Sequence, residues 1–248
     1  MGTLFPTLGF LNVYWFVFSY VADHFLYLPA LGIIVPLAAA AVRATEGRLP
    51  AAIRHLAAAL LLAGLGLLTW RQAGYYRDNE TLSRATLAHN PGCWLAHNNL
   101  GDALVLTGSE RLDEAIQHFQ TALRLKPDYP LSHYNLGNSY AKLPGRMPEA
   151  IAEYETALRL RPDYLQARVN LGNALASSGR KPEAIAQWES VLRVDPENIE
   201  ALLNLGLTLG QMPGQRDEAR ALVEKALQLA PDNARARRLL DRLNTGTR

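Results

Sequence analysis

Asparagine recurs at one place in a repeated Asn-Leu-Gly sequence, and its side-chain amide has the chemistry to bind a polypeptide backbone. An amide offers N–H donors and a carbonyl acceptor, so it can pair with peptide groups whatever side chains they carry. Three residues after each of the first three asparagines stands a second polar residue, on the same face of a helix. The predicted peptide-binding residues are Asn99, Asp102, Asn135, Asn138, Asn170, Asn173 and Asn204.

A row of amides on successive helices would match the spacing of an extended chain. Neighbouring helices pack about 8–10 Å apart, and an extended chain advances about 3.3–3.6 Å per residue, so each helix would meet about every third residue. The alternative is that the asparagines were inherited by duplication and only cap helices or solvate a groove. Asparagine is a mediocre helix former, so its presence in all four copies needs a reason, and shared ancestry supplies one.

The asparagines belong to a repeat whose copies are spaced by 36, 35, 34 and 35 residues. Apolar residues at i, i+3, i+4 and i+7 predict two amphipathic helices in each copy. Glycine and alanine let the two helices approach closely, and a closing proline ends the second helix. Leucine and glycine thus explain the packing, whereas the asparagine is not required by the fold. Counted from six residues before each Leu-Gly leucine, the copies start at Trp94, Pro130, Leu165, Ile199 and Ala234.

These positions resemble the tetratricopeptide repeat (TPR), whose pattern of small, large and proline residues occurs at the same offsets. The resemblance covers residues 94–233. The sequence departs from the family pattern at position 4, where a large aromatic is missing and His97, His133, Arg168 and Leu202 stand. The resemblance implies an all-α solenoid of four repeats, 94–129, 130–164, 165–198 and 199–233. Residues 234–248 are expected to form an arginine-rich capping helix and a tail.

Composition excludes several classes of site. The chain has one cysteine, Cys93, so it has neither an internal disulfide framework nor a thiol-rich metal site. The six histidines lack metal-ligand spacing, and no phosphate loop or nucleophile motif is present. Residues 92–248 balance basic against acidic side chains, which gives no electrostatic footprint for nucleic acid. We therefore expect no catalytic residue, no metal, no cofactor and no nucleic-acid partner.

The first part of the chain is apolar. The runs 27–43 and 51–70 are long enough to cross a bilayer, which needs about 20 mostly apolar residues. The run 4–21 holds clustered aromatics and predicts either a further span or an interfacial stretch. The expected fold is therefore all-α, with N-terminal transmembrane helices (1–72), a helical linker or half repeat (73–93), the TPR α-solenoid and the C-terminal capping helix.

A second resemblance lies in this part of the chain. The segments YVADHFLYLP (20–29) and YRDNETL (76–82), the latter running into NPGCW (90–94), are similar to the transmembrane-and-TPR O-mannosyltransferase-like family. In that family a multi-span glycosyltransferase domain precedes a TPR array. The resemblance implies that this chain is the C-terminal end of a longer protein and lacks the catalytic region. It also implies an integral membrane protein whose TPR region is periplasmic or luminal.

Two functions of different class follow from these patterns. The first is a membrane-anchored protein–protein interaction module, which binds an extended polypeptide client in its concave groove and has the lipid bilayer as a second partner. The alternative is the C-terminal fragment of an O-mannosyltransferase-like membrane glycosyltransferase, whose TPRs present the acceptor protein. The catalytic region of the resembling family is absent, so we do not expect this chain alone to be an enzyme.

Overall fold

The computed structural model describes residues 50–53, 56–57, 59–60, 63–64, 67 and 78–245. The chain divides into two compact units, Met1–Leu95 and Ala96–Arg248. In the first unit, helix α3 spans Asn79–His89, and the Asp78 carboxylate caps it by accepting the Thr81 backbone N–H at 2.7 Å.

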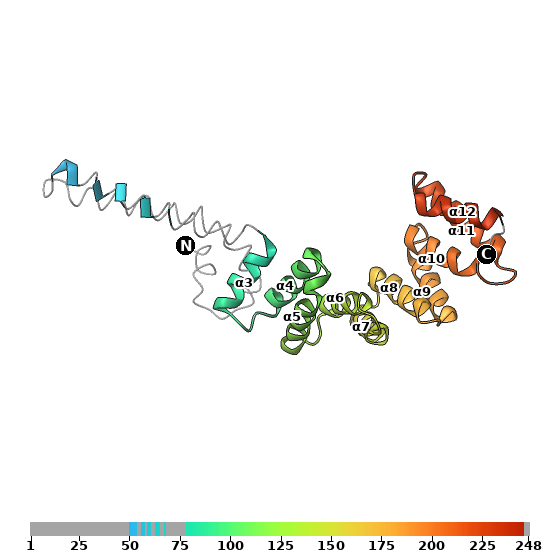
Figure 1. The fold of residues 1–248 in the computed structure, drawn as a ribbon, viewed down its shortest axis with the longest axis horizontal. Coiled ribbons are helices and arrows are strands. Elements are labelled where there is room, and N and C mark those ends of the chain that lie inside the picture. Colours follow the sequence, from blue (N-terminus) through green and yellow to red (C-terminus); the bar gives the residue numbers. More distant parts are fainter. Residues whose placement is uncertain are drawn as a thin grey trace. The chain divides into compact units, whose positions relative to one another are not determined.

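Helices make up the regular structure of residues 96–245, as the repeat pattern predicts, and no strand occurs there. Figure 1 labels the helices in chain order, and each repeat contributes two of them. The all-α solenoid is therefore confirmed. The helices are α4 (Trp94–Thr107), α5 (Leu112–Leu125), α6 (Pro130–Ala141), α7 (Met147–Leu160), α8 (Leu165–Ser177), α9 (Lys181–Val194), α10 (Ile199–Leu209), α11 (Arg216–Leu229) and α12 (Ala234–Thr245), with a short 3-10 helix, η4 (Ser109–Arg111), before α5.

Local sequence starts and ends these helices. Asn198 caps α10 by accepting the Ala201 backbone N–H at 3.0 Å, and Asn233 caps α12 through Ala236 N–H at 3.0 Å. Proline stands in the first turn of α6, α7 and α9, where its missing N–H costs nothing. Each second helix ends two residues before a proline, because the residue preceding proline is disfavoured in a helix.

Glycine allows the two helices of each repeat to touch. A Cβ added to Gly172 would lie 2.5 Å from Trp188 Nε1, and one added to Gly137 would lie 2.8 Å from Tyr154 Cε1. Both ring side chains are buried. Since any larger residue would collide with the ring, the Leu-Gly glycine is a packing requirement. The same contact recurs between Gly101 and Phe119 and between Gly206 and Val223.

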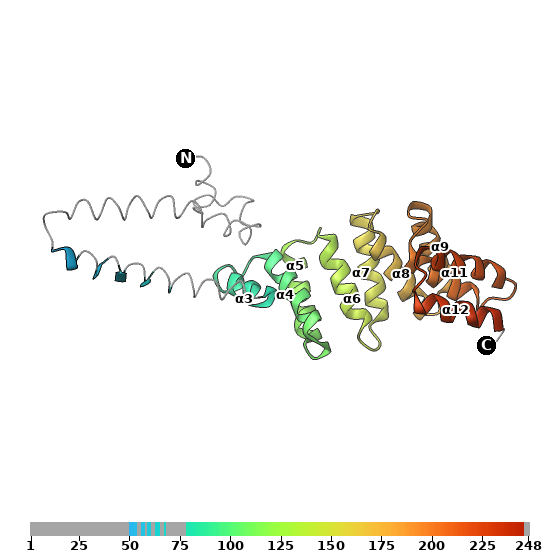
Figure 2. The same ribbon diagram turned by 90° about the horizontal axis from the view of Figure 1, so that it is seen from above.

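The helix pairs stack in sequence order. From α5 to α12, each helix contacts the next one along the chain. The first helices of successive repeats also touch, since α8 contacts both α6 and α10. Figure 2 shows the pairs following one another along the repeats. The first helices α6, α8 and α10 therefore lie side by side and present one continuous face.

Glycine also makes the turns between the two helices of each repeat. Gly108, Gly145, Gly179 and Gly214 have positive φ values of 139°, 77°, 79° and 77°. Residues with a Cβ avoid this region, so glycine is the residue that closes the turn without strain.

The membrane predictions are not supported. The runs 4–21 and 27–43 lie outside the described residues, and 51–70 is described only in part. Within the described residues, no helix combines the length and apolar character needed to cross a bilayer. The prediction of an integral membrane protein with a periplasmic or luminal repeat region is therefore wrong for the part of the chain that the structure describes. The domain limits at 72/73, 93/94 and 233/234 stay predictions.

Candidate functional site

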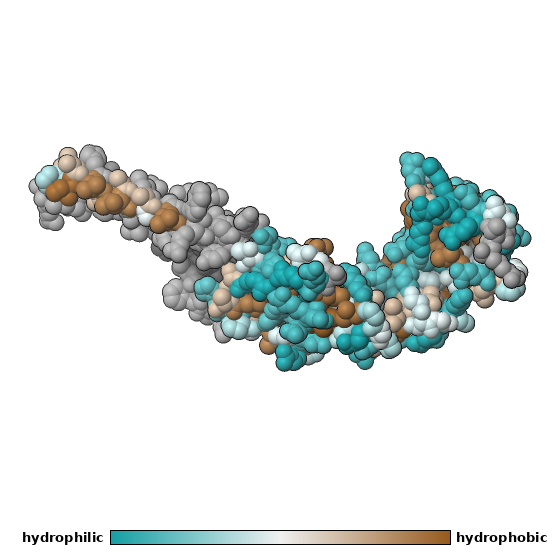
Figure 3. All heavy atoms as spheres, in the orientation of Figure 1, coloured by the Kyte–Doolittle hydropathy of each residue, from teal (hydrophilic) through white to brown (hydrophobic). Residues whose placement is uncertain are grey.

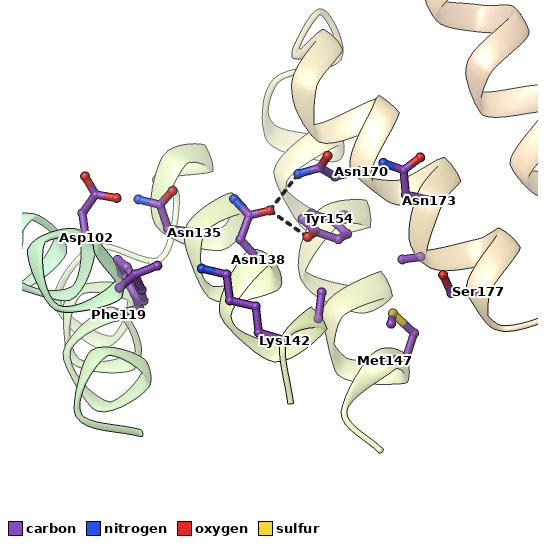
Figure 4. Close-up of a pocket in the computed structure, with 13 residues that line it drawn as sticks. Asp102, Phe119, Asn135, Asn138, Lys142, Met147, Tyr154, Asn170, Asn173 and Ser177 are labelled. Carbon is purple, nitrogen blue, oxygen red and sulfur yellow. Dashed lines mark hydrogen bonds between the residues drawn. The ribbon is translucent and has the colours of Figure 1, made fainter. Parts of the chain in front are cut away.

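The first helices of the repeats carry a cavity of about 450 Å³. Its polar lining contains five of the seven predicted residues, which extend from α4, α6 and α8 (Figure 4). Side chains from three repeats therefore meet in one place, although they are far apart in sequence. The five residues are Asp102, Asn135, Asn138, Asn170 and Asn173, and we call this face the amide groove.

Amides in neighbouring repeats bond to each other. Asn170 Nδ2 donates to Asn138 Oδ1 at 2.8 Å, and Asn204 Nδ2 donates to Asn173 Oδ1 at 2.7 Å. Figure 4 shows the first of these bonds. Two of the four Asn-Leu-Gly asparagines, Asn170 and Asn204, thus join their repeats to the preceding ones, so at these positions the asparagine also has a role within the solenoid. The duplication alternative does not include this role.

The same bonds orient the second asparagine of each pair. The Oδ1 of Asn138 accepts from Asn170 and also from the Tyr154 hydroxyl at 2.7 Å. The Nδ2 atoms of Asn138 and Asn173 make no hydrogen bond to any residue of 78–245. Each of these amides therefore uses its oxygen inside the solenoid and keeps two N–H donors at the groove.

A buried tyrosine supports this arrangement. Burial raises the pKa of Tyr154, and the neighbouring Tyr134, whose ring centroid is 6.2 Å away, raises it further. The Tyr154 hydroxyl therefore stays protonated at neutral pH and can keep donating to Asn138. Asn170 Nδ2 also lies 3.4 Å from the Tyr134 hydroxyl. These contacts fix the amides before any ligand arrives.

The groove has two charged groups. Asp102 and Lys142 both line the cavity, and both are exposed. Neither forms an ion pair with another residue of 78–245. The sequence prediction did not name Lys142 or the lining residue Ser177. Each stands seven residues after an Asn-Leu-Gly asparagine, two helical turns along the same face, so this spacing was the signal for them.

Two predicted residues lie apart from the cavity lining. Asn204 is buried, and its Oδ1 accepts a hydrogen bond from Arg235 at 2.5 Å. Asn99 Oδ1 lies 3.4 Å from the Nδ2 of Asn98. Asn98 is itself buried, and its Oδ1 accepts a hydrogen bond from the Ser132 hydroxyl of the next repeat at 2.7 Å. The structure therefore places Asn98 in the core, as a further link between repeats.

Other polar clusters in the described residues do not form a metal centre. His97 and His118 approach with their Nδ1 atoms 2.9 Å apart, and His133 Nδ1 lies 2.6 Å from Glu153 Oε2. Among the residues that the structure describes, no group of three or more His, Cys, Asp or Glu side chains could hold a metal ion.

Stacked helix pairs with a polar face across several repeats define a helical-repeat module for protein interaction. The class can be stated more narrowly, because two family profiles match this chain. One, described as TPR repeat, matches residues 109–143, 145–179 and 172–212, and the other, described as Tetratricopeptide repeat, matches 199–233. The chain belongs to the tetratricopeptide repeat family, whose members bind peptide or protein partners.

A curated relative carries the name of the family in the second resemblance, and the match to it lies in the repeat region. The chain is 35% identical over 132 residues of its repeat region to protein O-mannosyl-transferase Tmtc2 of Drosophila melanogaster. The match covers 52% of this chain and 14% of that relative, so the chain spans a small part of the relative's length.

Solved structures share the fold. The alignment with the crystal structure of MamA covers 66% of this chain and 94% of the MamA chain, with a TM-score of 0.58 and 24% sequence identity. A second structure is that of YrrB, described as a TPR protein with an unusual peptide-binding site. Its alignment covers 79% of this chain and 95% of the YrrB chain. Its TM-score is 0.55 and its identity 26%.

Proposed function

We propose that the amide groove binds an extended polypeptide through its backbone. The observation that carries this proposal is the pair of oriented amides, Asn138 and Asn173, whose oxygens are used within the solenoid and whose Nδ2 donors line the cavity. Donors that are fixed in advance lose little side-chain entropy when they bind, so the geometry favours affinity. Backbone carbonyls of the ligand are the matching acceptors.

The usual spacing of packed helices would suit an extended ligand. First helices about 8–10 Å apart would place one amide at about every third residue of a chain that advances about 3.3–3.6 Å per residue. Backbone recognition leaves most side chains of the client unread, so the groove would accept several sequences. The similarity to YrrB, described as having a peptide-binding site, supports this type of ligand.

Aspartate substitution tests the donors without removing the internal bonds. Asn138→Asp and Asn173→Asp keep the oxygen that accepts from Asn170 or Asn204, and lose the Nδ2 donors. Asp102 occupies the same repeat position naturally, so a carboxylate is compatible with the fold there. The probe is a peptide selected on the wild-type chain from a random library, with affinity measured by fluorescence anisotropy.

We expect each of the two substitutions to weaken binding about tenfold, since a lost hydrogen bond costs about 0.5–1.5 kcal/mol and a carboxylate repels the ligand carbonyl. Asn233→Asp is the matched control, because Asn233 caps α12 through its oxygen outside the cavity and undergoes the same charge change. Wild-type affinity in the doubly substituted chain, with unchanged thermal unfolding, would exclude backbone binding at the groove.

A second function is favoured by the Tmtc2 relative. We propose that the groove presents an acceptor polypeptide to an O-mannosyl-transferring site, in keeping with the name of that relative. In cells that express the Asn138→Asp/Asn173→Asp chain, O-linked hexose on polypeptides recovered with the repeats should fall relative to wild type. The measurement is glycopeptide mass spectrometry, and unchanged occupancy of the acceptor sites would rule out presentation.

A further inference from the structure

A second cavity lies at the C-terminal end of the repeats. It has a volume of about 800 Å³ and is formed by α10, α11, α12 and the turn after α10. Figure 3 shows an apolar patch near α10 within a largely hydrophilic surface. We call this cavity the C-terminal pocket, and its lining residues include four that are leucine or methionine and two that are arginine. They are Leu207, Met212, Leu239, Leu243, Arg216 and Arg242.

At the C-terminal pocket, the repeat position that Asn138 and Asn173 occupy no longer holds an amide. Leu207 occupies the repeat position of Asn138 and Asn173, and Arg242 occupies the same position of α12. Along successive first helices, this repeat position therefore changes from amide donors to an apolar side chain and then to a cation. A ligand that runs along the first helices would leave the amide groove, which suits its backbone, and reach the C-terminal pocket, which suits particular side chains.

Close packing of α12 forms this pocket. A Cβ on Gly210 would lie 2.6 Å from Leu243 Cδ2, so glycine at this position lets α12 approach α10. Leu239 and Leu243 are buried in that contact, and Met212 of the preceding turn stays partly exposed. The apolar part of the pocket is thus held by the core, and a large side chain could enter beside Met212 and Leu207.

The two arginines of the pocket lack acidic partners. Neither Arg216 nor Arg242 forms an ion pair with any residue of 78–245, and the pocket lining contains no carboxylate. Nearby arginines differ, since Arg220 pairs with Asp217 at 3.2 Å, and Arg237 forms a similar pair. Two like charges beside an apolar surface are complementary to an anionic group carried next to an apolar one.

We propose that the C-terminal pocket binds a large apolar side chain adjacent to an Asp or Glu side chain within the client polypeptide. This inference rests on the proposed function, because the segment would be part of the chain held in the amide groove. The apolar side chain would contact Leu207 and Met212, and the carboxylate would accept from Arg216 and Arg242. The groove would supply general affinity, and the pocket would select the client.

The test compares labelled, C-terminally amidated peptides of about twelve residues, long enough for about three residues on each of four first helices. The three peptides share one background sequence of Ser, Thr and Gln and differ in a dipeptide near one end. The dipeptide is Leu-Glu in the first peptide, Leu-Gln in the second and Ala-Glu in the third. In the wild-type chain, we expect Leu-Glu to bind about tenfold tighter than Leu-Gln, the ratio that about 1.4 kcal/mol of charge-assisted bonding gives. Ala-Glu should also bind more weakly than Leu-Glu.

Arginine substitution separates the pocket from the groove. Arg216→Gln/Arg242→Gln should abolish the preference for Leu-Glu and leave Leu-Gln binding unchanged. The matched control, Arg220→Gln/Arg237→Gln, removes the same charge from paired arginines and should keep the preference. Asn138→Asp/Asn173→Asp should weaken all peptides alike and leave the ratio intact.

Three outcomes would overturn the inference. They are equal binding of Leu-Glu and Leu-Gln, a preference that survives Arg216→Gln/Arg242→Gln, and a Leu-Gln peptide with a free C-terminal carboxylate that binds as tightly as amidated Leu-Glu. The last result would mean that the pocket recognises a chain end. Failure of the proposed function of the amide groove would be seen separately, because peptide affinity would then be unchanged in Asn138→Asp/Asn173→Asp.

Discussion

The contact between Gly172 and Trp188 makes a quantitative prediction about the fold. The Trp188 side chain is buried, and its Nε1 donates to the Val169 carbonyl at 3.3 Å. In Gly172→Ala, the new Cβ would lie 2.5 Å from Nε1 and 2.8 Å from Cε2. The ring must then move, and the bond to Val169 must lengthen.

The expected cost of Gly172→Ala combines three effects. Overpacking a core costs about 1–3 kcal/mol, and weakening the indole hydrogen bond costs about 1 kcal/mol. Alanine returns about 1 kcal/mol, because it is a better helix former than glycine. The free energy of unfolding should therefore fall by about 1–3 kcal/mol.

A double-mutant cycle isolates the contribution of the ring. Trp188→Ala removes the ring atoms that the new Cβ would strike, so Gly172→Ala should then stabilise the chain by about 1 kcal/mol through helix propensity alone. The assay is urea unfolding followed by helical circular dichroism in all four chains. An equal loss from Gly172→Ala in both backgrounds would refute the argument that the glycine is required by the tryptophan.

Three further predictions concern other contacts. Asn98→Ala should lower the free energy of unfolding by about 1–3 kcal/mol, because the buried Ser132 hydroxyl loses its acceptor; Ser132→Ala in the same background should recover part of that loss. Gly179→Ala should cost about 1 kcal/mol in urea unfolding, because its φ is 79° and the turn strains a Cβ, whereas an unchanged midpoint would contradict this. Desolvation lowers the pKa of His133, but hydrogen bonds with Glu153 and a backbone carbonyl raise it more, so the net pKa is raised. Protonated His133 therefore stabilises the fold below its ordinary pKa of about 6.5, and this stability is lost as pH rises through the raised value. Thermal unfolding at pH 6 and pH 8 should show this difference in wild type and a smaller one in His133→Gln.

Much of the fold was predictable because it depends on steric limits within one repeat. Gly172 and Gly137 must be glycine, since a ring lies against each of them. Proline ends each second helix for reasons local to the backbone. Such constraints recur with the repeat, so a single sequence aligned on itself reveals them.

The partners of the amides were not predictable in the same way. Helical periodicity tells which residues share a face of one helix, and this brought Asn138 and Asn170 into the same candidate site. It does not tell which atom of one repeat meets which atom of the next, because that depends on how the helix pairs stack. The bond between Asn170 and Asn138, and the approach of α12 that forms the C-terminal pocket, therefore required the structure.

The glycine turns also determine where this protein can change in length. The turns at Gly145, Gly179 and Gly214 have open space around the glycine, and the repeats differ in length within these turns. The differences in length between repeats are thus absorbed where they do not disturb the alignment of first helices that forms the amide groove. For the same reason, the turn at Gly179 is a suitable place to graft an epitope or a fluorescent label.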